Sequence, residues 1–241
     1  MDPRISVIGK RLSKINRIIA VASGKGGVGK SLIASTLSLN LSKKGYKVGL
    51  LDLDLYGPSS HVILGVTDYS FPEEEKGILP HEVDGIKFIS IVYFTEDKPA
   101  PLRGMDITNI IIELLSITQW GTLDFLIIDM PPGIGDETLD VIKLVKNCEF
   151  LVVTTPSKVS IFAVSKLLKI LKELKLPIIG VIENMQMKPS DYIKTNLSKM
   201  NIYYLNSIKL DKNLEESIGE PKLLLQTDFM KDFEKIIEKI I

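Results

Sequence analysis

One segment near the N-terminus limits the folds open to this chain more than any other. It fits the pattern G-x-x-x-x-G-K-[ST] and consists of Gly24, Lys25, Gly26, Gly27, Val28, Gly29, Lys30 and Ser31. Apolar residues 18–22 precede it and an amphipathic stretch follows it, as a phosphate-binding loop requires. Glycines let backbone N–H groups surround a phosphate, and the helix that follows adds its positive dipole end. The segment therefore predicts a strand, a phosphate loop and a helix; the alternative is a plain glycine-rich turn.

The rest of the chain alternates short apolar segments with helical patterns. We expect strands at 18–22, 48–51, 86–92, 125–128, 150–154 and 178–182. We expect helices at 30–44, 107–118, 137–146 and 160–174. Strands that are apolar throughout are covered on both faces, and strand–helix alternation favours parallel pairing. The prediction is an α/β protein: residues 1–241 form a single P-loop NTPase domain, with a mostly parallel sheet covered by helices on both faces.

Four segments are expected to lie outside the strand–helix alternation. Residues 1–16 read as an N-terminal extension, 67–84 as an acidic surface loop, and 188–201 as irregular chain. Residues 227–241 have the pattern of an amphipathic helix. Such a helix could lie on a membrane if its polar face were basic. Here lysines alternate with Asp and Glu, so a helix that docks on the sheet is favoured.

Polar residues that follow the predicted strands complete a nucleotide site. Lys30 is expected to reach the β- and γ-phosphates, and the Ser31 hydroxyl to bind Mg²⁺. Asp52 and Asp54 end the second strand, where ligands bind in such sheets. We expect Asp54 to position the attacking water and Asp52 to support the Mg²⁺ shell, with an Asp-rich turn as the alternative.

Two further strand ends complete the list of expected contacts. Asp129 ends an apolar strand and is expected to hold Mg²⁺ through water. Asn184 follows another strand, and an amide can pair with the adenine edge, although Asn is also common in turns. No guanine-type N-K-x-D motif occurs, so ATP is favoured over GTP.

Composition narrows the partners and the compartment. The formal net charge is zero, so a basic nucleic-acid footprint is not expected. Every apolar run is too short to span a membrane, and the N-terminus lacks the pattern of a signal peptide, so we expect a cytoplasmic protein. Cys148 is the only cysteine, and it is interpreted as a small core or surface residue. His61 and His81 have no metal-ligand spacing and are expected at the surface; the alternative for His61 is packing near the nucleotide.

Several motifs taken together resemble the Mrp family of P-loop ATPases, also called the ApbC or Nbp type, which is related to MinD and ParA. They are the loop at 24–31 with its extra lysine (the deviant Walker A form), the Asp-Leu-Tyr-Gly-Pro-Ser segment at 54–59, Arg103 and Gly104, and residues 120–124, 129–136 and 183–185. The resemblance implies an ATPase that carries or scaffolds iron–sulfur clusters for apoproteins. It also implies a homodimer in which Lys25 touches the nucleotide of the other subunit, and it places Asn184 on the adenine; the alternative for Lys25 is a solvated loop residue.

The chain departs from this family at the cluster ligands. The family has a Cys-x-x-Cys pair shortly after the Asn-Met segment, whereas residues 184–191 here contain no cysteine. Thiolates are the usual ligands of such clusters. The leading hypothesis is therefore a dimeric ATP switch whose cargo is an iron–sulfur cluster or a client protein. The alternatives are a MinD/ParA-like spatial regulator, a nucleotide-binding adaptor with negligible turnover, and a small-molecule kinase.

Overall fold

The computed structural model describes residues 2–95 and 105–241. Within them, eight strands form one sheet in the order β3-β4-β2-β5-β1-β6-β7-β8. All neighbouring strands are parallel except β3 and β4. This confirms the predicted fold class. The strands are β1 (Ile15–Ser23), β2 (Val48–Asp52), β3 (His81–Val83), β4 (Ile86–Ser90), β5 (Leu123–Asp129), β6 (Cys148–Thr154), β7 (Ile178–Gln186) and β8 (Tyr204–Lys209).

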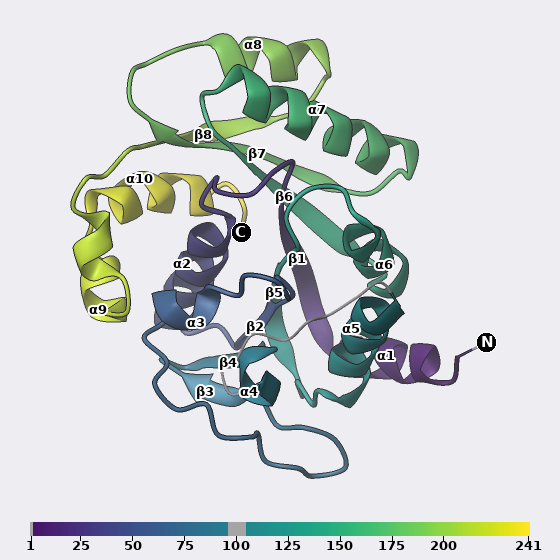
Figure 1. Ribbon diagram of the computed structural model, residues 1–241. Coiled ribbons are helices and arrows are strands. Elements are labelled where there is room, and N and C mark those ends of the chain that lie inside the picture. Colours follow the sequence, from purple (N-terminus) through teal and green to yellow (C-terminus); the bar gives the residue numbers. More distant parts are fainter. Residues whose placement is uncertain (1, 96–104) are drawn as a thin grey trace.

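Helices cover both faces of the sheet, so the structure has three layers (Figure 1). One core cluster lies under α1 (Arg4–Leu12), α5 (Met105–Ile117), α6 (Asp136–Leu144), α7 (Lys158–Glu173) and α8 (Tyr192–Lys199). The other lies under α2 (Lys30–Lys43), α3 (Ser60–Ile63), α9 (Pro221–Leu224) and α10 (Asp228–Ile237). Two short elements complete the fold, α4 (Val92–Thr95) and the 3-10 turn η1 (Leu214–Ser217). The central strands β2, β5 and β6 are buried along almost their whole length because each side packs against one of these helical layers.

Two local predictions are wrong. The strand expected over 86–92 ends at Ser90, and α4 begins at Val92. Residues 188–201 are not irregular, because they contain α8. Ile193 and Leu197, one turn apart, are its buried residues, and two apolar positions in a short polar segment are too weak a signal to identify a helix.

Three of the segments expected outside the strand–helix alternation contain regular elements. Residues 1–16 contain α1, which packs against α5 through Ile8 and Leu12, and β1 already begins at Ile15. Residues 67–84 contain β3 and the buried Ile78. Residues 227–241 contain α10, which packs on α2 and β8 with Phe229, Phe233 and Ile236 buried. The apolar face of α10 is therefore covered by the same chain.

Candidate functional site

The loop at 24–31 joins β1 to α2 and is held in a curved shape by its glycines. Gly27 and Gly29 have φ values of 73° and 84°, in the left-handed region that favours glycine. The Ser23 hydroxyl donates to the Lys25 carbonyl over 2.9 Å and closes the first turn of the loop. The loop forms one wall of a cavity of about 320 Å³ that is also lined by Ser31, Asp54 and Pro132. The sequence-predicted phosphate loop therefore borders an open, ligand-sized space.

The sheet register brings the predicted carboxylates to this loop. The Cα of Asp129 pairs with Val21 of β1 on one side and with Asp52 of β2 on the other. Lys30 is 6% exposed and donates from Nζ to Asp129 Oδ1 over 2.5 Å. Its Nζ also lies 3.9 Å from Asp54 Oδ2. One buried ammonium thus joins the loop to two carboxylates at the carboxyl ends of the central strands, where ligands bind in sheets of this type.

The Asp52 carboxylate accepts hydrogen bonds from two backbone N–H groups, which the sequence did not indicate. Its Oδ1 accepts the backbone N–H of Asp54 over 3.0 Å, and its Oδ2 accepts the N–H of Ser60 over 3.3 Å. The Ser60 hydroxyl in turn donates to Asp129 Oδ2 over 3.1 Å. Ser60 is a site residue that sequence reasoning missed, although it directly follows the Tyr-Gly-Pro-Ser motif. Asp52 and Ser60 together fix the turn that presents Asp54 to the cavity.

The electrostatics of the site favour a bound cation. Burial, followed by the negative charge of Asp129, raises the pKa of Asp52. Burial also raises the pKa of Asp54, while Lys30 opposes that rise. Asp54 and Asp129 thus share the one ammonium of Lys30, and Asp52 lies buried beside them, where unpaired charge is costly. The Ser31 hydroxyl lies on the cavity wall beside them, so the oxygen donor set fits Mg²⁺, which keeps several waters and takes few protein ligands.

Asn184 lies against the phosphate loop. Its Nδ2 donates to the Val28 carbonyl over 3.0 Å, and the residue is buried. A Cβ added at Gly29 would lie 2.3 Å from the same Nδ2. Asn184 therefore braces the loop in this structure, and its contact with an adenine base remains a prediction.

Cys148, His61 and His81 do not line the loop cavity. Cys148 begins β6 and pairs with Ile18 of β1, whereas Ser23, which precedes the loop, pairs with Val153 near the other end of β6. Burial raises the pKa of its thiol to about 12. His61 is buried with its ring edge-on to Tyr69, so its expected surface position is wrong. His81 is half-buried and stacks on Tyr93 at a ring distance of 4.1 Å. No group of three or more His, Cys, Asp or Glu suited to a metal ion occurs within residues 2–95 and 105–241, and Arg103 and Gly104 lie outside them.

Comparison with known proteins assigns the chain to a family of P-loop NTPases. A family model described as NUBPL iron-transfer P-loop NTPase, of the ParA group, matches residues 14–241. The chain belongs to the NUBPL iron-transfer family of ParA-type P-loop NTPases. The iron–sulfur cluster carrier protein of Methanocaldococcus jannaschii is 36% identical to this NTPase, over 97% of the chain and 87% of that protein. The iron–sulfur cluster carrier protein of Aquifex aeolicus is 38% identical over 91% of this chain. The match spans only 65% of the length of the Aquifex aeolicus protein.

Solved structures support the same assignment. A nucleotide-binding protein from Archaeoglobus fulgidus, solved in complex with ADP, superposes on this NTPase with a TM-score of 0.80 and 30% identity. The superposition covers 95% of this chain and 96% of that one. The cell division ATPase MinD from Pyrococcus furiosus gives a TM-score of 0.70 at 24% identity, which shows a shared fold alone. The chain is thus a nucleotide-hydrolase family member with the expected sheet and loop.

The glycines of the NTPase loop provide a first test of this packing. A Cβ at Gly24 would lie 2.4 Å from the backbone nitrogen of Val164 in α7, whereas a Cβ at Gly26 would meet only Pro132, at 4.0 Å. We expect Gly24→Ala to push the loop away from α7 and lower the melting temperature by several degrees, because backbone atoms of α7 cannot move aside. Gly26→Ala should melt close to the parent. Thermal denaturation without nucleotide checks both, and equal melting temperatures would contradict the close packing of the loop on α7.

Proposed function

We propose that the chain is a Mg²⁺-dependent ATPase that acts as a homodimeric switch in iron–sulfur cluster delivery. The observation that carries the proposal is the position of Lys30, held by Asp129 and Asp54 at the wall of the loop cavity. Triphosphate oxygens that enter the cavity can replace the carboxylates as partners of this ammonium. Phosphoryl transfer needs mainly positioning and charge stabilisation, and the residues that supply both lie together here.

Each predicted residue has a role in this proposal. The backbone of residues 24–31 surrounds the phosphates, and Ser31 with Asp129 holds Mg²⁺, which would neutralise phosphate charge when bound. Asp52 supports the turn and the water shell of the metal. Asp54 orients the attacking water, since it is the carboxylate of the three that lines the cavity.

Asn184 is proposed to select adenine as well as to brace the loop. We expect Asn184→Ala to weaken ATP binding by roughly 10-fold, because the Val28 carbonyl loses its buried donor and such a loss costs about 1–3 kcal/mol. The preference for ATP over GTP should fall at the same time. Calorimetric titration with each nucleotide measures both effects. If ATP and GTP weaken by the same factor, Asn184 braces the loop and does not read the base.

Lys25 is proposed to act across the dimer. It is half-buried and lines the loop cavity. Within the part of the chain that the structure describes, its ammonium has no hydrogen-bond or ion-pair partner. It is therefore free to contact the nucleotide bound by a second copy. ATP binding would close the dimer and hydrolysis would open it.

The cargo is proposed to be held by a client protein and not by the thiol of this chain. The related proteins are named iron–sulfur cluster carriers. In this chain Cys148 is 2% exposed at the start of β6. A thiol whose pKa is about 12 is almost wholly protonated at neutral pH, and cluster iron binds the thiolate. The switch would therefore act on a client that brings its own cluster ligands.

Anaerobic reconstitution with iron and sulfide tests this assignment. We expect no stoichiometric cluster on the purified chain, no reaction of Cys148 with a thiol reagent until the protein is unfolded, and full ATP hydrolysis in the Cys148→Ser variant. Bound iron and labile sulfide per dimer, thiol labelling and phosphate release are the three readouts. A stoichiometric cluster that disappears in Cys148→Ser would make Cys148 a ligand and would overturn the assignment.

A MinD-like action at a membrane is less well supported. The apolar face of α10 is buried on α2 and β8, so it is not available to lipid in this structure. Among the described residues, no helix has both the length and the hydropathy needed to span a membrane.

A further inference from the structure

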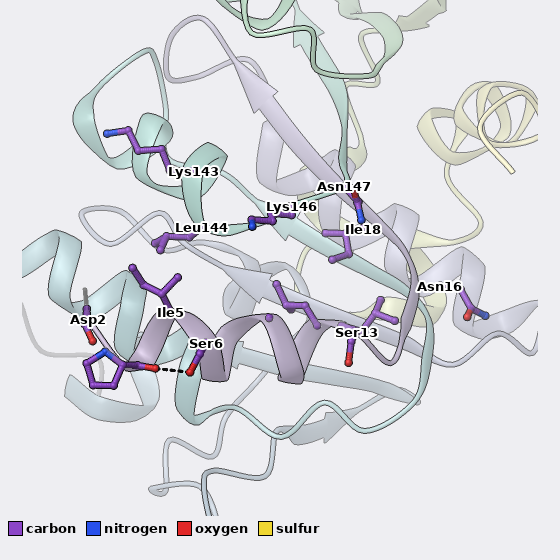
Figure 2. A pocket seen from close by; sticks show the side chains of 14 residues that line it. Asp2, Ile5, Ser6, Ser13, Asn16, Ile18, Lys143, Leu144, Lys146 and Asn147 are labelled. Carbon is purple, nitrogen blue, oxygen red and sulfur yellow. Dashed lines mark hydrogen bonds between the residues drawn. The ribbon is translucent and has the colours of Figure 1, made fainter.

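A second cavity lies between α1, the start of β1 and the turn from α6 to β6 (Figure 2). Its volume is about 650 Å³, within the range of small-molecule sites. The residues that line it include Ile18, at the first half of β1, whereas the phosphate loop follows the far end of that strand. No residue of this cavity lines the loop cavity, so the two sites are separate.

The floor and one side of this α1 cavity are apolar. Ile5, Leu12, Ile15, Ile18 and Leu144 line it. Ile5 is 40% exposed, although burying a side chain of this size against a neighbour would stabilise the protein. In Figure 2 Ile5 projects from α1 toward Leu144. An exposed aliphatic side chain in a hollow is a feature of surfaces that bind apolar groups.

Gly9 gives an independent reason to regard the cavity as a site. It lies in the interior of α1 and lines the cavity, and glycine there costs about 1 kcal/mol relative to alanine. A Cβ at Gly9 would have no atom within 4 Å, so packing within this chain does not require glycine. The glycine instead leaves open the space above the middle of the helix.

The polar groups around the cavity differ in whether they already have a hydrogen-bond partner. Ser6 and Ser13 donate to carbonyls of their own segment, Asn16 donates to Asp124, and Asp2 is bound by Arg4. Lys146 is exposed, and within the described ranges its ammonium has no partner. Figure 2 shows the Lys146 side chain extending toward Leu144, whereas the Lys143 side chain points away from the cavity. The cavity therefore combines an aliphatic body with one unpaired positive charge.

We propose that the α1 cavity binds an amphipathic carboxylate, such as a medium-chain fatty acid. Its alkyl chain lies along Ile5, Gly9, Leu12 and Leu144, and its carboxylate pairs with Lys146. Apolar burial supplies most of the affinity, and the ammonium selects the anion over the neutral alcohol.

Calorimetric titration of the full chain with octanoate, octan-1-ol and acetate tests the proposal. Octanoate should bind at one site per chain, octan-1-ol at least 10-fold more weakly, and acetate not at all. Gly9→Leu, which fills the cavity, should abolish octanoate binding, while Gly9→Ala should keep it. Both variants should melt no lower than the parent, because both residues are better helix formers than glycine. Phosphate release from ATP should be unchanged in both.

A charge pair of variants completes the test. Lys146→Glu should weaken octanoate binding by 10-fold or more, while Lys10→Glu, on α1 but outside the cavity lining, should leave it unchanged. Absence of octanoate binding would overturn the proposal, and so would binding that survives both Gly9→Leu and Lys146→Glu. Attachment of the protein to phosphatidylglycerol vesicles without octanoate binding would also overturn the proposal, because this face would then bind a lipid surface and not a single amphipathic carboxylate.

Discussion

Lys30→Met is expected to abolish ATP hydrolysis and to destabilise the nucleotide-free protein. The buried Lys30 ammonium lies 2.5 Å from Asp129 and 3.9 Å from Asp54. Removing one partner of a buried ion pair costs about 3–5 kcal/mol, because the other charge is left without compensation. Loss of the same cation from the developing phosphate charge should lower kcat/KM by roughly 100-fold or more. Phosphate release and denaturant unfolding without nucleotide measure the two effects.

The paired carboxylate allows these two effects to be separated. Adding Asp129→Asn to Lys30→Met removes the nearer of the two charges left without compensation, so the double variant should recover part of the lost stability but none of the activity. Lys25→Ala, which removes an ammonium that has no partner in the described residues, should leave the unfolding free energy unchanged. If Lys30→Met unfolds at the same denaturant concentration as the parent, the Lys30–Asp129 pair does not stabilise the site.

Asp54→Asn is expected to separate ATP binding from hydrolysis. Asp54 lines the cavity, and its Oδ1 accepts the N–H of Gly57, an interaction that an Asn carbonyl can keep. The shape of the turn should therefore survive, while the carboxylate that orients water is lost. Turnover should fall by roughly 100-fold, whereas the dissociation constant for ATP should change little, because Asp54 is proposed to act on the water and not on the nucleotide.

The same variant reports on the dimer. With hydrolysis blocked, Asp54→Asn should stay dimeric for as long as ATP is bound, which light scattering after size-exclusion chromatography measures. Adding Lys25→Ala to this background should return the protein to monomers. A monomeric Asp54→Asn protein at saturating ATP would contradict the proposed switch.

Local sequence signals predicted the loop, six of the eight described strands and five of the ten described α-helices, because those strand segments are apolar on both sides and the loop pattern fixes a strand and a helix around it. The signals failed where elements are short. α4 follows β4 after one residue, and α8 has only two buried side chains. Such elements form because the surrounding core covers them, and periodicity over so few residues does not indicate this.

The predicted site residues came together for the same topological reason, since Asp52 and Asp129 end neighbouring parallel strands in register. Two contacts depended on the tertiary fold and had no sequence signal. The Ser60 hydroxyl reaches Asp129 only because α3 begins beside the end of β5, and Asn184 reaches the Val28 carbonyl only because β7 ends behind the loop. The α1 cavity could not be predicted from the sequence either, because it is formed by residues 2–18 and 143–147, which are distant from each other along the chain.

Release of inorganic phosphate from ATP by the purified chain tests the central claim most directly. With Mg²⁺ present, the parent should hydrolyse ATP continuously, and Lys30→Met should release no phosphate above the protein-free background. Chelation of Mg²⁺ should stop the parent as well. A folded parent that releases no phosphate, or a Lys30→Met variant that matches it, would contradict an ATPase site at this loop.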